Sequence, residues 1–102
     1  MRRDANNLLS MLHTWQLNDV STIPSYRGDL PAALGSIRAK ATVLAGQTDL
    51  YFRPEDVEAD AAHIPGARFR VIPSLWGHMA GAGLNPPDSE FIQAEIKALL
   101  AT

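Results

Sequence analysis

Residues 41–72 read ATVLAGQTDLYFRPEDVEADAAHIPGARFRVI, two short apolar runs that are joined by a segment with helical spacing. The first run, residues 41–45, is continuous and ends at Gly46, which predicts a strand covered on both faces. The proline at position 54 opens a helix, because its fixed φ suits the first helical turn. Residues 67–72 alternate apolar and basic side chains and predict a second strand. A right-handed strand–helix–strand unit makes the two strands parallel.

Helical patterns flank this unit on both sides. Before it, residues 4–17 have the spacing of an amphipathic helix with one buried face, and a shorter helical pattern covers residues 30–37. After it, two prolines precede Asp88, the predicted N-cap of a helix that runs to the C-terminus. The apolar stripe of the first helix consists of Leu8, Met11, Leu12 and Trp15.

The predicted fold class is therefore α/β, with two helical pieces followed by strand, helix, strand and helix, and with parallel strands. Residues 1–40 form the helical segment, and residues 41–102 form the βαβα part. Two parallel strands with unpaired outer edges make a poor sheet on their own. We therefore expect the chain to be the last part of a larger sheet, or to complete its sheet in a homo-oligomer or with a partner chain.

Composition narrows the classes of function. The 102 residues are 46% hydrophobic and 20% charged, as in an ordinary globular protein. The net charge is −2 and the sequence contains no cluster of Lys or Arg that could bind a phosphate backbone, so we expect no nucleic-acid partner. No apolar stretch is long enough to span a bilayer and the N-terminus does not resemble a signal peptide, so we expect no membrane partner and a cytoplasmic location. The absence of cysteine excludes disulfides and thiolate chemistry.

Two titratable residues follow the two predicted strands. Asp49 lies shortly after Gly46, and His78 comes after the second strand, directly behind Gly77. Because the carboxyl ends of parallel strands meet at one edge of a sheet, the loops that leave them can bring these side chains into contact. The carboxylate would then accept the Nδ1 proton of the imidazole and leave Nε2 free as a general base.

Each candidate also has a purely structural interpretation. His78 could instead occupy a loop position where a backbone carbonyl accepts its proton, and Asp49 could close a turn after the strand, but the combination of the two motifs favours the catalytic interpretation. Ser74 is not predicted to be a nucleophile, since it lacks a strained elbow, and turn capping is favoured. A metal site made of His63, His78 and Asp49 is disfavoured, because the spacing has no helical ligand pair.

Three longer stretches carry a family resemblance. "DANNLLSMLHTWQLND", "AGQTDLYFRPED" and "IPSLWGHMAGAG" are similar to the homoserine O-acetyltransferase family, and the order of elements resembles the C-terminal end of an α/β-hydrolase fold. This resemblance implies a Ser-Asp-His triad with Asp49 as its acid and His78 as its base. It also implies that residues 1–40 end a helical lid region, which often takes part in dimerisation in such enzymes.

The same resemblance implies the chemistry. A small-molecule acyl substrate would react through a covalent acyl-serine, with no metal or nucleotide cofactor, and acetyl-CoA would be a co-substrate only in an acetyltransferase. The chain departs from the family pattern in one respect, because none of its serines has a glycine two residues before it, as the G-x-S-x-G elbow requires.

The expected function is therefore the C-terminal portion of a serine-dependent acyltransferase or hydrolase that is inactive alone. The alternative is a non-catalytic truncated domain that self-associates or docks on a partner chain.

Overall fold

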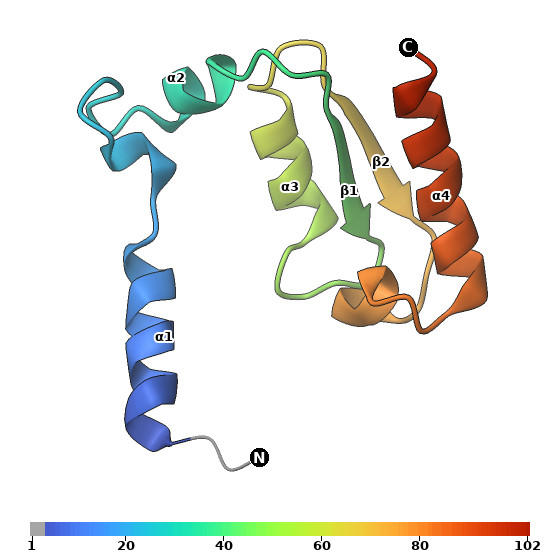
Figure 1. Cartoon of the computed structure of the whole chain (residues 1–102), viewed down its shortest axis with the longest axis horizontal. Coiled ribbons are helices and arrows are strands. Elements are labelled where there is room, and N and C mark those ends of the chain that lie inside the picture. Colours follow the sequence, from blue (N-terminus) through green and yellow to red (C-terminus); the bar gives the residue numbers. More distant parts are fainter. Residues whose placement is uncertain (1–3) are drawn as a thin grey trace. The chain divides into compact units, whose positions relative to one another are not determined.

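The computed structural model describes residues 4–102 and is drawn in Figure 1. The chain divides into two compact units, Met1–Ala33 and Leu34–Thr102. The first unit contains the α-helix α1 (Ala5–Leu17) and a short 3-10 helix (Val20–Thr22), and the second contains the sheet. The short helix α2 (Leu30–Gly35) includes residues of both units.

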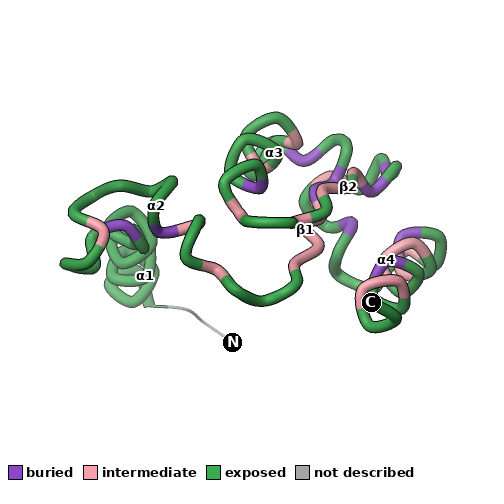
Figure 2. The backbone as a smooth tube through the Cα atoms, turned by 90° about the horizontal axis from the view of Figure 1, so that it is seen from above, coloured by how far each residue is buried: buried purple, intermediate pink, exposed green. Residues whose placement is uncertain are grey.

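The helix predicted over residues 4–17 is confirmed as α1, but its predicted burial is wrong. Asp4 caps the helix by accepting a hydrogen bond from the backbone N–H of Asn6 at 2.9 Å. None of the residues of α1 is buried, and Figure 2 shows the helix exposed along its length. Leu12 and Trp15 of the apolar stripe are 44% and 56% exposed. The spacing indicated an apolar face correctly, but it did not determine whether that face is buried.

The second unit has the predicted α/β order. Strands β1 (Thr42–Gly46) and β2 (Arg68–Ile72) are parallel, with Thr42 paired to Arg68 and Gly46 to Ile72. Helix α3 (Pro54–Ala61) connects them, and helix α4 (Pro86–Leu100) follows β2. The two helices cover opposite faces of the sheet, and the loops that leave both strands lie at the same end of it (Figures 1 and 2).

Prolines set the starts of both long helices in this unit. Pro54 is the first residue of α3, and two acidic residues in its first turn face the positive end of the helix dipole. Helix α4 begins at Pro86 with Asn85 as its N-cap, so the prediction that Asp88 is the N-cap is wrong. The fixed φ of proline fits the first helical turn, where its missing N–H costs nothing. Asp88 therefore lies inside the first turn of α4 and is buried.

The face of β2 that carries basic residues packs against α4 through a buried carboxylate. Glu95 of α4 is buried, and its side chain lies 3.5 Å from Arg68 and 3.6 Å from Arg70. The Arg70 guanidinium also lies over the ring of Phe91 of α4, 5.8 Å from its centroid. The basic residues at alternate positions of β2 therefore share one carboxylate partner on α4.

The core is made of small side chains. The buried hydrophobic residues of the second unit are Ala45, Ala61, Ile72 and Ala80, whereas Leu50, Leu75 and Leu100 are at least 80% exposed. Each strand has one partner within residues 4–102, so each has an unpaired outer edge there. Within the same described range, no helix combines the length and apolarity that a membrane span requires.

The end of β1 leaves no room for a side chain. A Cβ at Gly46 would lie 2.8 Å from the carbonyl oxygen of Gly77, a backbone atom in the loop that follows β2. We predict that Gly46→Ala lowers the free energy of unfolding by about 1–3 kcal/mol, since the two loops must move apart.

Urea unfolding of Gly46→Ala beside Gly81→Ala tests this, because a Cβ at Gly81 meets no atom within 4 Å. Equal stability of the two variants would contradict the close approach of the two loops.

Candidate active site

The loop after β1 holds a carboxylate in a fixed orientation. The backbone N–H of Asp49 donates to the carbonyl of Gly46 at 3.1 Å, which closes a turn directly after the strand. Oδ1 of Asp49 accepts hydrogen bonds from the N–H groups of Tyr51 at 2.8 Å and Phe52 at 3.1 Å. The turn-forming interpretation of Asp49 is thus confirmed, and it leaves the second carboxylate oxygen available for another partner.

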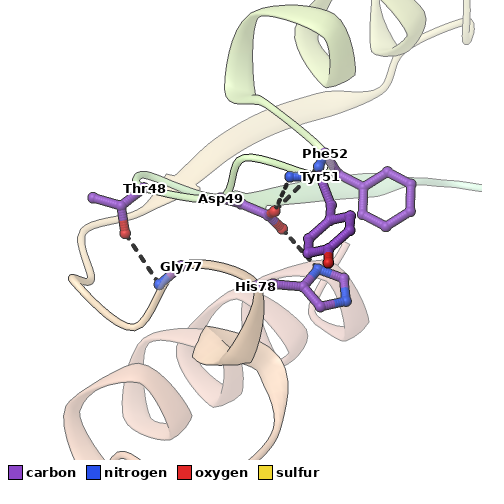
Figure 3. A network of polar contacts seen from close by, with 6 residues as sticks. All are labelled: Thr48, Asp49, Tyr51, Phe52, Gly77 and His78. Atoms are coloured by element: carbon purple, nitrogen blue, oxygen red, sulfur yellow. Dashed lines mark hydrogen bonds and ion pairs between the residues drawn. The ribbon is translucent and has the colours of Figure 1, made fainter.

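That partner is the imidazole that follows β2. Nδ1 of His78 lies 3.1 Å from Oδ2 of Asp49, as drawn in Figure 3. Asp49 is buried, whereas the His78 side chain is 51% exposed. The other ring nitrogen, Nε2, points away from Asp49 (Figure 3). The pair therefore consists of a buried anion and a half-exposed imidazole whose second nitrogen points away from that anion, an arrangement that suits a general base.

Two aromatic rings lie beside the imidazole. The ring centroid of His78 is 5.1 Å from that of Tyr51 and 5.6 Å from that of Phe52. These are the same two residues whose N–H groups hold Asp49, so one short segment orients both members of the pair. Both contacts are tilted rather than stacked, with interplanar angles of 52° and 33°.

Opposing influences act on the acidity of Asp49. Burial raises its pKa, but the backbone N–H groups of Phe52 and Tyr51 and the nearby His78 ring outweigh this, so that the pKa lies below its ordinary value of 3.8. Asp49 is therefore an anion throughout the neutral range, as an acceptor for the Nδ1 proton must be.

A pocket of about 390 Å³ opens beside the pair. Asp49, Phe52 and His78 line it together with apolar residues that include Leu44, Val57 and Ile92. Apolar walls with a few polar groups among them are typical of sites for small organic molecules.

A second set of polar contacts joins the two loops, and the sequence did not reveal it. The hydroxyl of Thr48 accepts a hydrogen bond from the N–H of Gly77 at 3.0 Å, as Figure 3 shows, and donates to the carbonyl of Ser74 at 3.1 Å. Ser74 caps its own turn by accepting from the N–H of Trp76 at 3.1 Å, as predicted, and its hydroxyl donates to Asp88 at 2.6 Å. The position of Thr48 beside Asp49 was the only signal in the sequence.

The alternative of a metal site has no set of ligands close enough together among the described residues. In residues 4–102 no group of three or more His, Asp or Glu side chains is placed to hold a metal ion. His63, the third ligand considered, follows the end of α3, and Asp49 and His78 pair without it.

Comparison with known proteins gives relatives of consistent type, although no family model matches the chain. "Probable esterase Cgl0839" of Corynebacterium glutamicum is 42% identical over 79 residues, which are 78% of this chain and 22% of that protein. Ethyl acetate hydrolase of Pseudomonas veronii is 35% identical over 99 residues, 97% of this chain and 28% of that protein. Homoserine O-acetyltransferase of Cyclobacterium marinum is 31% identical over 77 residues, 72% of this chain and 22% of that protein.

Solved structures agree with these sequences. An acetylester hydrolase of Corynebacterium glutamicum and the acetyl esterase MekB each superpose with a TM-score of 0.87 at 35% identity, over 98% of this chain and 28% of theirs. The relatives are thus esterases and a homoserine O-acetyltransferase, which fits the α/β-hydrolase resemblance, and the esterases are the more similar. The chain spans only 22–28% of the length of the relatives that it matches.

The lowered pKa of Asp49 predicts a specific pH dependence of stability. Its contribution to the free energy of unfolding is fully present above the ordinary pKa of 3.8 and is lost as the pH falls through the lower pKa of the folded state. Asp49→Asn should therefore be less stable than the native chain at about pH 5, and the difference should shrink toward about pH 2.

Urea unfolding across this range measures the difference, with Asp60→Asn on the exposed side of α3 as the control. A difference between Asp49→Asn and the native chain that stays constant with pH would contradict the prediction.

Proposed function

We propose that this chain is the C-terminal part of a serine-dependent ester hydrolase with an α/β-hydrolase fold, in which Asp49 is the triad acid and His78 the triad base. The observation that carries the proposal is the 3.1 Å contact between Nδ1 of His78 and Oδ2 of Asp49, on an imidazole whose side chain is 51% exposed. Similarity to esterases over nearly the whole chain supports the same chemistry.

In the proposed reaction His78 moves one proton in two directions. Nε2 takes the proton of a serine hydroxyl as that oxygen attacks the ester carbonyl, and Asp49 stabilises the imidazolium that forms. The imidazolium then gives the proton to the departing alcohol, which leaves an acyl-serine. Water attacks the acyl-serine in the same way, with His78 again as base, and releases the acid. The steps need two side chains of this chain, one serine and water.

Hydrolysis is favoured over transfer by the pattern of similarity. The hydrolases reach 42% and 35% identity and the acetyltransferase 31%. The names of the related hydrolases refer to ethyl acetate and to acetyl esters. We therefore propose short-chain acyl esters as the substrate class, with water as the acceptor in place of a hydroxyl substrate, and without acetyl-CoA as donor.

No serine among the 102 residues has the pattern of the nucleophile in this reaction. None of the serines lies in a G-x-S-x-G elbow, and the hydroxyl of Ser74 is hydrogen-bonded to Asp88 and to the N–H of Trp76. We propose that the nucleophile belongs to the part of the fold that the longer relatives have and this sequence does not contain.

A chimera tests the proposal. The matching 28% of the Corynebacterium glutamicum acetylester hydrolase is replaced by this chain. The chimera should hydrolyse p-nitrophenyl acetate, Asp49→Asn should lower its kcat by roughly 10⁴-fold, and His78→Ala should lower it by on the order of 10⁶-fold. His63→Ala serves as the control and should leave the rate unchanged. A folded chimera without activity, or one that keeps its rate after His78→Ala, would refute the assignment.

A second candidate function has its own observation. The unpaired strand edges and the exposed apolar side chains also fit a non-catalytic domain that self-associates or docks on a partner chain. Under either function we predict that the isolated chain shows no ester hydrolysis and is oligomeric in solution.

Light scattering after gel filtration, combined with an esterase assay, checks both expectations. A stable folded monomer would contradict the inference from the strand edges, and turnover abolished by His78→Ala would contradict the absence of the nucleophile.

A further inference from the structure

A buried carboxylate near the site is not used by the proposed reaction. Asp88, in the first turn of α4, is 3% exposed, and its Oδ2 accepts a hydrogen bond of 2.6 Å from the hydroxyl of Ser74, which is 4% exposed. Burial of a carboxylate is costly unless its charge is balanced by hydrogen bonds, and a hydroxyl that donates to an anion makes one of the stronger ones. The position in the first turn of a helix stabilises the anion further.

The Ser74 hydroxyl links the buried carboxylate of Asp88 to the loop that carries the imidazole. While it donates to Asp88, the same oxygen accepts a hydrogen bond from the N–H of Trp76 at 3.1 Å. Asp88 therefore determines the direction of the hydroxyl hydrogen and leaves a lone pair for Trp76. The chain continues from Trp76 through Gly77, which has a φ of 55°, to His78. The start of this loop is thereby fixed to α4.

Thr48 connects the anchored loop to the other member of the pair. Its hydroxyl donates to the carbonyl of Ser74 and accepts from the N–H of Gly77, so it spans the turn that precedes His78. Thr48 and Gly77 are the direct chain neighbours of Asp49 and His78. The hydrogen bond between the two neighbours sets the separation of the loops at the point where the carboxylate meets the imidazole.

We infer that Asp88 is a positioning residue, which acts through Ser74 and Thr48 to hold the His78 ring against Asp49. The catalytic meaning of this inference rests on the proposed function, but the positioning itself is a property of the chain. Without an acceptor at position 88, the Ser74 hydroxyl is free to reorient and Trp76 loses its fixed partner. The loop then relaxes, and the hydrogen bond from Nδ1 to Asp49 lengthens.

NMR of the full chain with 15N-labelled histidine tests the inference without any activity measurement. At a pH where imidazole rings are neutral, we expect the native chain to hold His78 as the Nδ1–H tautomer, with a slowly exchanging Nδ1 proton. Asp88→Ala and Ser74→Ala should abolish that proton signal and mix the tautomers, and Ser74→Thr, which keeps the hydroxyl, should restore both. His13 and His63 are internal references in the same spectra.

Glu95→Ala is the matched control for a merely structural effect. Glu95 is a second buried carboxylate of α4, and its partners are Arg68 and Arg70 rather than the His78 loop. It should lower stability while leaving the tautomer of His78 unchanged. If Glu95→Ala and Asp88→Ala alter the His78 signals equally, or if neither alters them, the inference is overturned.

A gentler pair of variants covers the case in which the Asp88 and Ser74 variants fail to fold. Thr48→Val removes the bridging hydroxyl and keeps the shape of the side chain, whereas Thr48→Ser keeps the hydroxyl. Valine should weaken the Nδ1 proton signal and serine should retain it, and identical spectra would count against the network.

In the chimera, Asp88→Ala should lower kcat by up to about 10²-fold with little change in KM. An inactive chimera would refute the proposed function and leave the NMR result to decide the positioning.

Discussion

Parallel pairing of two short strands is the constraint on which the rest of this structure depends. Because β1 and β2 run in the same direction and Gly46 is paired with Ile72, both strands end at the same edge of the sheet. Residues that come after them are then neighbours in space although 29 positions separate Asp49 from His78 in the chain. An antiparallel pair would have placed the two loops at opposite ends, and the carboxylate and the imidazole could not have met.

The sequence predicted some features of this structure and missed others. The continuous apolar run before Gly46 and the alternation in residues 67–72 are local patterns, and they predicted both strands and the meeting of Asp49 with His78. The burial of α1 was not predictable in the same way, since the spacing of Leu8, Met11, Leu12 and Trp15 indicates an apolar face but not what covers it. Asp88 was predicted as the N-cap, but the helix already begins at Pro86. Its hydrogen bond with Ser74 joins residues 14 positions apart, and a contact of that range leaves no periodic signal.

The site combines rigid and accessible parts in a way that suits acid–base chemistry. The carboxylate is buried and fixed by two backbone N–H groups, and the imidazole that it orients is half exposed and lines a pocket. One oxygen of Asp49 holds the turn and the other meets the imidazole, so the structural and the proposed catalytic interpretations of Asp49 do not exclude each other. In the proposed function the nucleophile comes from outside these 102 residues, and the chain covers 28% of the length of the related esterases.

The proton between His78 and Asp49 offers the most direct measurement of the central claim. The account predicts a downfield, slowly exchanging Nδ1 proton of His78 in the 1H NMR spectrum of the chain, which disappears in Asp49→Ala and persists in Asp60→Ala. A His78 ring without such a proton, or one whose proton is unaffected by the loss of the Asp49 carboxylate, would contradict it.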